Sequence, residues 1–222
     1  MRRRLIIGLI LGIGFGVSGV SGYAQGDEAN VLLNNLAKNF EKLEQFSAEA
    51  VIKVDVDFIK IKDRVIKVRF EKPDKFTFDS EGLTLLPKNG LQLEYLTLIS
   101  KGYTSILAGQ EDLSGIHTKI VKVIPEIETE DIVLAQMWID PVANRIVKMK
   151  TYTKKSGSYL IEFKYTDHPF NLPDQTVVTF DISALTLPAK VMSEFQPQAE
   201  KVKEGPSTAR VIVQYRNYKV NQ

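Results

Sequence analysis

The chain has 222 residues, of which 44% are hydrophobic and 25% charged, with no cysteine and a formal net charge of +2. This length suits one hydrophobic core and does not require a second domain. Without cysteine, the chain cannot form disulfides, thiolate metal sites, a cysteine nucleophile or a lipid-modified N-terminal cysteine.

Residues 1–24 differ from the rest of the chain. A run of three arginines follows the first methionine, residues 5–17 are apolar and uncharged, and Gly22 and Ala24 place small side chains before a cleavage point. This order predicts a secretory signal peptide, because the apolar run is shorter than the roughly 20 residues of a membrane-spanning helix. An uncleaved N-terminal anchor is the alternative. We expect a periplasmic protein whose residues 25–222 form a single domain.

The positive charge belongs to this N-terminal segment. The segment holds three of the 29 basic residues and none of the acidic ones, which leaves 26 basic against 27 acidic residues in the remainder. A nearly neutral chain with both signs interspersed lacks the charge distribution of a nucleic-acid-binding protein. We therefore expect no nucleic-acid partner.

An amphipathic helix is predicted over residues 29–44. Its hydrophobic side chains recur at spacings of three and four, which places them on one face of a helix. They are Leu32, Leu33, Leu36, Phe40 and Leu43. Such a helix is stable only against another hydrophobic surface, and we expect it to lie on a sheet formed by the rest of the chain.

From residue 47 onward the hydrophobic period changes to two. Ile52, Val54 and Val56 alternate with Lys53 and Asp55, which is typical of a strand with one wet and one apolar face. The same pattern, bounded by turn residues, predicts strands over 66–71, 76–78, 118–124, 134–140, 145–153, 158–166, 176–181 and 209–220. Short turns between them favour antiparallel pairing.

These elements predict a mainly β (α+β) fold with about nine to eleven strands and few helices. A long sheet with one apolar face must cover that face, so we expect an unclosed antiparallel half-barrel with helices over its concave hydrophobic face. Residues 83–100 show no clear period and are expected to form a lid helix or a loop and strand. Residues 196–207 are expected to form an exposed excursion.

Residues that could carry catalysis or bind a metal are few. His117 and His168 lie far apart in the sequence, and neither has metal-ligand spacing. Residues 14–19 match GxGxxG but lie inside the signal peptide, away from any strand–helix unit. Asp55 and Asp57 alternate with aliphatic residues as the solvated side of a sheet does. Trp138 stands alone, and we expect it in the core. We predict no enzyme, no metal site and no cofactor.

Four stretches in order resemble the LolA-like superfamily of periplasmic outer-membrane lipoprotein carriers. The first, residues 39–48, joins the end of the helix to the start of the first strand, and the second, residues 68–76, is a strand, a basic-proline turn and another strand. The third, residues 137–157, is the Met-Trp-Ile-Asp-Pro run with the hairpin that follows it. The fourth, residues 171–181, is the Asn-Leu-Pro-Asp turn with its strand. The resemblance implies an unclosed barrel with a helical lid and a hydrophobic cavity for acyl chains. It implies transfer of a lipoprotein from an inner-membrane transporter to an outer-membrane acceptor. We expect a monomer.

Candidate ligand-binding residues follow from the apolar helix face and the apolar strand faces. They are Leu32, Leu36, Phe40, Leu43, Ile52, Val54, Val56, Ile66, Val68, Phe70, Phe76, Phe78, Tyr159, Ile161 and Phe163. The resemblance also implies a latch for the lid at the basic residue before the turn proline, here Lys72 in place of arginine. Lysine keeps the charge but lacks the planar fork of donors.

Two other functions remain open. A non-enzymatic envelope sensor or protein-interaction module could use the same fold, since a fold does not fix a function. Such a module would bind through residues 83–100 or 196–207. A hydrolase is disfavoured because the chain lacks a GxSxG nucleophile and a metal-ligand constellation.

Overall fold

The computed structural model describes residues 22–56, 59–60, 62–73, 75–79, 98–99, 102–126, 132–154, 157–166, 168–181 and 208–221. Its helices are α1 (Gly22–Glu41) and the 3₁₀ helix η1 (Pro169–Asn171). Its strands are β1 (Gln45–Val56), β2 (Ile59–Lys60), β3 (Arg64–Glu71), β4 (Lys75–Asp79), β5 (Tyr103–Leu113), β6 (Ile116–Pro125), β7 (Ile132–Asp140), β8 (Arg145–Thr153), β9 (Ser158–Lys164), β10 (Gln175–Asp181) and β11 (Thr208–Val220).

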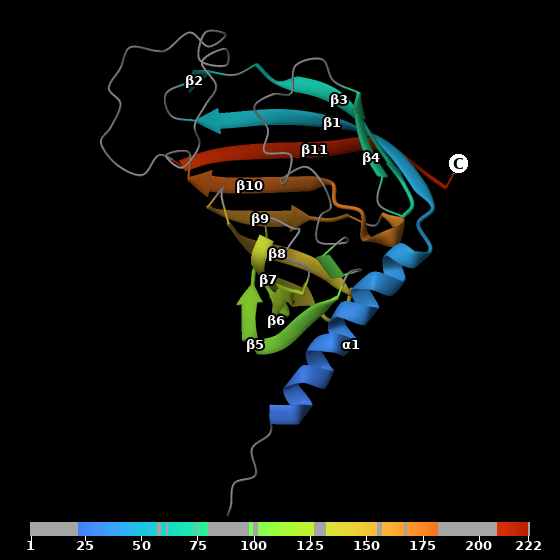
Figure 1. Cartoon of the computed structure of the whole chain (residues 1–222). Helices are drawn as coiled ribbons and strands as arrows, with labels where there is room; N and C mark the ends of the chain where they lie inside the picture. Colours follow the sequence, from blue (N-terminus) through green and yellow to red (C-terminus); the bar gives the residue numbers. More distant parts are fainter. Residues whose placement is uncertain are drawn as a thin grey trace, which may run out of the picture.

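The strands form one antiparallel sheet in the order β4-β3-β1-β11-β10-β9-β8-β7-β6-β5, and β2 pairs with β1 beyond this path. Among the described strands, β4 and β5 are the two edges and do not pair with each other, so the sheet is not closed. Figure 1 shows these strands stacked from β3 to β5 with α1 across one end. The predicted fold class, a mainly β unclosed sheet carrying a helix, is confirmed.

The two faces of the sheet differ as period-two patterning requires. In β1, Phe46, Ala48, Ala50 and Ile52 are buried, whereas the residues between them are exposed or half-buried. We call the face that carries these buried residues the inner face and the opposite one the outer face. Residues opposite each other in neighbouring strands share a face, so the register carries this assignment across the sheet.

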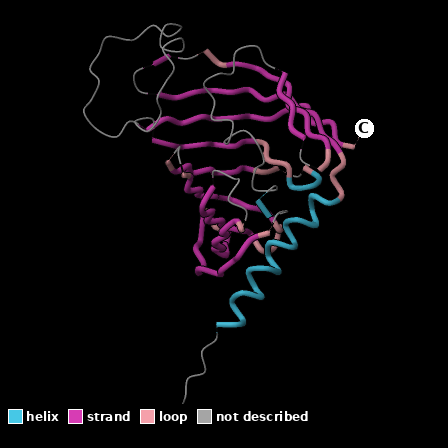
Figure 2. The backbone as a smooth tube through the Cα atoms, in the orientation of Figure 1, coloured by secondary structure: helices cyan, strands magenta, loops and turns pink. Residues whose placement is uncertain are grey.

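Helix α1 covers part of the inner face. Leu33 and Leu36 are 0% and 1% exposed and belong to the same hydrophobic cluster as the inner-face residues. Figure 2 shows the helix running from beside β5 to the end of the sheet where β1 begins. The amphipathic stripe predicted this packing, because an apolar helix face needs an apolar surface.

The helix boundaries differ from the prediction. The helix spans Gly22–Glu41, whereas the stripe predicted residues 29–44, because residues 22–28 carry no apolar period. It ends early because the chain turns there: the amide of Leu43 donates to the carbonyl of Phe40 at 2.9 Å, and β1 begins at residue 45. Leu43 nonetheless remains fully buried.

The strand β5 was not predicted. Its second half is polar and exposed, with Gln110, Glu111 and Asp112 in succession. The β5–β6 register shifts between Leu107 and Gly109, and Gly109 has φ +135°. A bulge of this kind breaks the alternation that identifies a strand in a sequence. The predictions for residues 83–100 and 196–207 lie outside the described residues, except that Leu98 and Ile99 are buried.

The alternation in β11 also changes, at Asn217. Val211, Val213 and Tyr215 lie on the inner face, and after Asn217 the inner-face positions become Tyr218 and Val220. Asn217 has φ +56°, and the register with β1 shifts between Ser47 and Glu49. The extra residue is a β-bulge, which keeps five hydrophobic side chains of one strand on one face.

Candidate functional site

The predicted ligand-binding residues all lie in one hydrophobic cluster beneath α1 and along the inner face. Phe40, Val54, Phe76 and Phe78 are half-buried and pack against this cluster. The other eleven are buried: Leu32, Leu36, Leu43, Ile52, Val56, Ile66, Val68, Phe70, Tyr159, Ile161 and Phe163. The structure therefore brings these residues together, and their binding of a ligand remains a prediction.

Sequence reasoning missed other members of the inner face. Five further buried side chains of the cluster are Phe46, Met137, Met149, Val178 and Phe180. Each lies at an alternating position of its strand, so the period-two rule that selected Ile161 and Phe163 could have found them.

Aromatic rings concentrate on the inner face of β1, β3, β4 and β11. The ring of Phe46 lies 5.6 Å from Phe70 and 5.8 Å from Tyr218, and Phe70 lies 4.9 Å from Phe76, between ring centroids. Aromatic pairs at these distances attract one another beyond their burial of area. This end of the inner face is thus an apolar aromatic surface.

Two half-buried tyrosines, Tyr165 and Tyr215, pack against the same hydrophobic cluster. Burial raises the pKa of Tyr215 to about 12, and burial also raises the pKa of Tyr165, because an apolar environment disfavours the phenolate. The hydroxyl of Tyr165 donates to the carbonyl of Ile146 at 2.6 Å. Both hydroxyls therefore stay neutral to a higher pH than an exposed tyrosine does, which is compatible with an apolar ligand.

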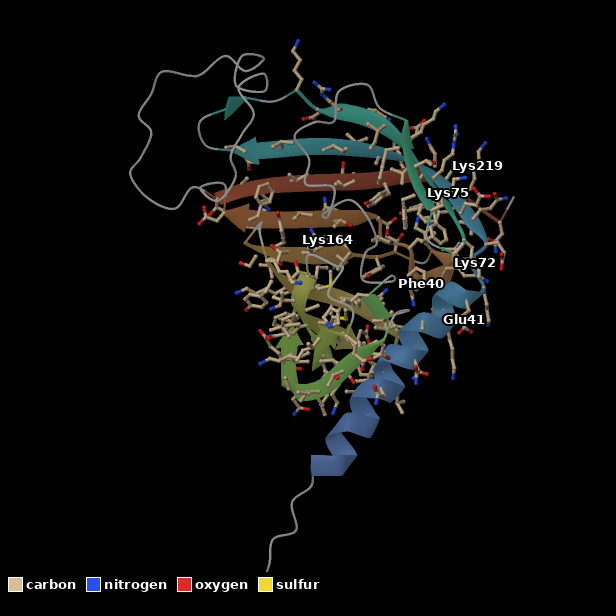
Figure 3. The ribbon with its side chains drawn as sticks, viewed as in Figure 1. Phe40, Glu41, Lys72, Lys75, Lys164 and Lys219 are labelled. Carbon is tan, nitrogen blue, oxygen red and sulfur yellow. The ribbon has the colours of Figure 1, made fainter. Side chains whose placement is uncertain are left out.

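The C-terminal end of α1 contacts the basic turn that was predicted as a latch. Lys72 donates from Nζ to the carbonyl oxygen of Glu41 at 2.8 Å and to Oε1 of Glu44 at 2.9 Å (Figure 3). Glu41 is the last residue of α1, where carbonyls lack helical partners and the helix dipole is negative. The geometry suits the predicted latch, and the latching role itself remains to be tested.

Further hydrogen bonds near the same end of α1 were not predicted. Asn39 donates from Nδ2 to the carbonyl of Asn144 at 3.1 Å, in the turn between β7 and β8. Asn221 accepts from the amide of Glu44 at 2.9 Å and donates to the carbonyl of Lys42 at 3.0 Å. These partners are more than 100 positions apart, so no local pattern could indicate them.

The first half of α1 is held by contacts of Glu28 and Asn30 to β5 and β6. The hydroxyl of Ser105 donates to Oδ1 of Asn30 at 2.8 Å, and Lys119 Nζ lies 3.0 Å from Oε1 of Glu28. Both contacts are at least partly exposed, so each stabilises weakly. Polar contacts therefore attach α1 to the sheet in its first half and at its C-terminal end, with most of the apolar stripe between them.

The two histidines considered as candidates lie on different elements, each beside a carboxylate. His117 pairs with Asp112 at 2.6 Å on the β5–β6 hairpin, and His168 pairs with Asp174 at 3.0 Å beside η1. In the part of the chain that the structure describes, no three His, Asp or Glu side chains are grouped so that they could hold a metal. The ring of Trp138 is buried and lies under Lys148, whose Nζ is 4.0 Å from the ring centroid.

Neither described helix is long and apolar enough to cross a membrane.

Asp55 is exposed on the outer face, as expected for the solvated side of the sheet. Asp57 lies outside the described residues.

Comparison with solved structures identifies the fold. A putative outer-membrane lipoprotein-sorting protein domain from Vibrio parahaemolyticus aligns with a TM-score of 0.57 at 11% identity, over 89% of this chain and 94% of that one. A DUF1329 family protein from Desulfovibrio piger aligns with a TM-score of 0.56 at 13% identity, over 89% and 93% of the two chains. A LolA superfamily protein from Nitrosomonas europaea aligns with a TM-score of 0.53 at 8% identity, over 87% and 94%.

No protein-family model and no curated protein matches the chain. At such low identities the structural matches concern the fold alone. They confirm the resemblance seen in the sequence at that level: this chain has the LolA-like fold.

Proposed function

We propose that the protein is a periplasmic carrier that binds the acyl chains of a lipid or of an outer-membrane lipoprotein against its inner face. The observation that carries this proposal is the single hydrophobic cluster that the inner face and the apolar stripe of α1 form together, with half-buried apolar residues packed against it. The LolA-like fold supports it, because one structure of that fold is named as a lipoprotein-sorting domain.

The physical basis is the hydrophobic effect acting on the acyl chain. Each methylene group that leaves water contributes about 0.8 kcal/mol, so a long chain can be held without any directional contact. The half-buried residues Val54, Phe76 and Phe78 lie at the rim of the cluster. We assign them to first contact with the acyl chain, because partly exposed apolar side chains gain most from covering.

Entry of the acyl chain would require α1 to shift away from the sheet. The polar contacts of α1 with the sheet are exposed or partly exposed and open at low free-energy cost. The larger cost is exposure of the buried apolar stripe, which the acyl chain would offset by taking the place of the sheet against it. In this proposal an inner-membrane transporter supplies the cargo and an outer-membrane acceptor removes it. No catalytic group is needed for either step.

Binding of a fluorescent acyl probe tests the proposal. Phe78→Gln places a polar group on the inner face of an edge strand, where the half-buried position tolerates it, and is expected to weaken probe binding about tenfold, the order expected for losing one buried aromatic contact. Ile106→Gln is the matched control, because Ile106 is 48% exposed on the outer face of the other edge strand. Equal affinities of both variants and the wild type would overturn the assignment of the inner face.

The protein-interaction module is distinguished by the same assay. A module of that kind has a filled core and takes up no acyl probe, whatever its variants do. The residues to which that alternative assigned binding, 83–100 and 196–207, lie almost entirely outside the described residues.

A further inference from the structure

Four side chains form a row across the outer face, on the opposite side of strands that also carry the proposed acyl site. In the sheet register, Thr77 of β4 lies opposite Arg69 of β3, Arg69 opposite Ser47 of β1, and Ser47 opposite Lys219 of β11. Directly opposed residues have neighbouring side chains on the same face. Two hydroxyl groups therefore alternate with a guanidinium and an ammonium group across four strands.

The cations in and beside this row outnumber the acids. Glu49 accepts from Arg216 at 3.0 Å and from Asn217 at 3.1 Å, although its opposite neighbour on β3 is Lys67. Glu71 pairs with Lys75 at 2.9 Å.

Glu49 and Glu71 are thus already paired with other cations, and a third acid, Asp79 of β4, lies opposite Lys67 in the register. Within the described part of the chain, no ion pair or side-chain hydrogen bond reaches Lys67, Arg69 or Lys219. Three cations without an ion pair among the described side chains therefore lie together, on a chain that is otherwise nearly neutral.

The surface around this row is hollowed. One depression of about 420 Å³ is lined by Ser47, Arg69, Thr77 and Lys219, together with Gln45, Phe46, Phe70 and the paired Glu71 and Lys75. Two more of about 320 Å³ adjoin it, one reaching Lys67 and Asn217 and the other lying between Lys67 and Thr77. Arg69 lines all three. Small Ser47 and Thr77 side chains between long basic ones account for the depressions.

We propose that this outer surface, defined by Ser47, Lys67, Arg69, Thr77 and Lys219, docks onto an anionic phospholipid bilayer by binding headgroup phosphates. Arginine and lysine with hydroxyl donors match phosphate oxygens. Several shallow, adjoining depressions over four strands fit an array of identical anions better than a single peptide side chain. Val65, which is 57% exposed on the same face of β3, adds an apolar contact for the interface.

The docking surface lies near the end of α1. The turn that follows β3 carries Lys72, which contacts Glu41, and Figure 3 shows Lys72, Lys75 and Lys219 on the side of the molecule where α1 ends. Docking would bring that end of α1 close to the bilayer. The inference goes beyond the proposed function and does not depend on it, because phosphate binding at the outer face needs no acyl chain at the inner face.

Vesicle co-sedimentation tests this inference. The full mature protein is mixed with vesicles of phosphatidylcholine alone, or with about one third phosphatidylglycerol, at low and high salt. The test variant carries Lys67→Gln, Arg69→Gln and Lys219→Gln. The control carries Lys122→Gln, Lys164→Gln and Arg210→Gln, three exposed cations on β6, β9 and β11 with the same total charge change. Acyl-probe uptake by the test variant is measured in parallel and is expected to be unchanged.

The expected result is salt-sensitive binding to the anionic vesicles only. Each basic residue at an anionic membrane contributes about fivefold, so the test variant should lose on the order of 100-fold and the control variant far less. Binding that ignores phosphatidylglycerol, equal losses in both variants, or equally tight, variant-sensitive binding of polyglutamate in place of vesicles would overturn the proposal. The polyglutamate outcome would reassign the surface to an acidic protein partner.

Discussion

In the turn after β3, Nζ of Lys72 donates a hydrogen bond to the backbone carbonyl of Glu41, the last residue of α1, at 2.8 Å. Lys72→Ala is expected to leave the fold intact and to loosen the end of α1, because this capping hydrogen bond is lost while the apolar stripe remains. The unfolding free energy should fall by no more than about 1 kcal/mol, as is usual for exposed pairs. Amide hydrogen exchange measures this loosening, and we expect faster exchange over residues 39–44 in the variant.

Lys75→Ala is the matched control for that variant. Lys75 pairs with Glu71 at the same 2.9 Å that separates Lys72 from Glu44, but it makes no hydrogen bond to α1. Equal exchange rates over residues 39–44 in the two variants would show that Lys72 does not restrain the helix.

Packing of α1 predicts a large difference between two positions of the helix. Leu36→Ala should destabilise the protein by about 2–5 kcal/mol, because Leu36 is 1% exposed and its removal leaves a cavity. Val31→Ala should change stability by no more than about 0.5 kcal/mol, because Val31 is 56% exposed. Denaturant unfolding measures both, and similar values would mean that α1 does not pack on the sheet as described.

The bulge at Asn217 predicts an unusual order of substitutions. Asn217→Gly should cost little, because glycine adopts φ +56° freely and the hydrogen bond to Glu49 that it loses is exposed. Asn217→Val should cost about 1–2 kcal/mol, because a β-branched residue is strained at positive φ. If valine, the better strand former, were tolerated as well as glycine, the bulge would not exist in solution.

The buried phenol of Tyr215 predicts sensitivity to alkali. The folded pKa of about 12 exceeds the ordinary value of 10.0, so the stabilisation is fully present below pH 10.0 and is lost as the pH rises toward 12. Tyr215→Phe removes the ionisable group, and its unfolding free energy should fall less steeply over that range. Parallel pH profiles for the two proteins would contradict the burial of this hydroxyl.

Much of the fold could be predicted because its elements are locally patterned. The stripe through Leu32 and Leu36 identified α1, and the alternation around Ile52 and Ile161 identified strands and their inner face. Such periods report which side chains avoid water, and burial dominates folding energetics. The strand β5 was not predicted, because its exposed, polar second half and its bulge near Gly109 leave no alternation of hydrophobic residues in the sequence.

The long-range arrangement could not be read from the sequence. Strand β1 lies between β3 and β11, and nothing local to β1 specifies a partner near the C terminus. The attachment of Asn39 to Asn144 and the row through Arg69, Ser47 and Lys219 depend on this pairing. In the sequence, each of these residues looks like an ordinary solvent-exposed polar residue, and only the strand register places them side by side.

The central claim, that the inner face carries acyl chains, is tested most directly by native mass spectrometry of the mature protein isolated from the periplasm without detergent. Organic extraction and lipid analysis of the same sample identify any cargo. We predict a co-purifying diacyl lipid or acylated protein at close to one copy for each protein molecule. Protein that is isolated empty and that also fails to take up an acyl probe would contradict the carrier function.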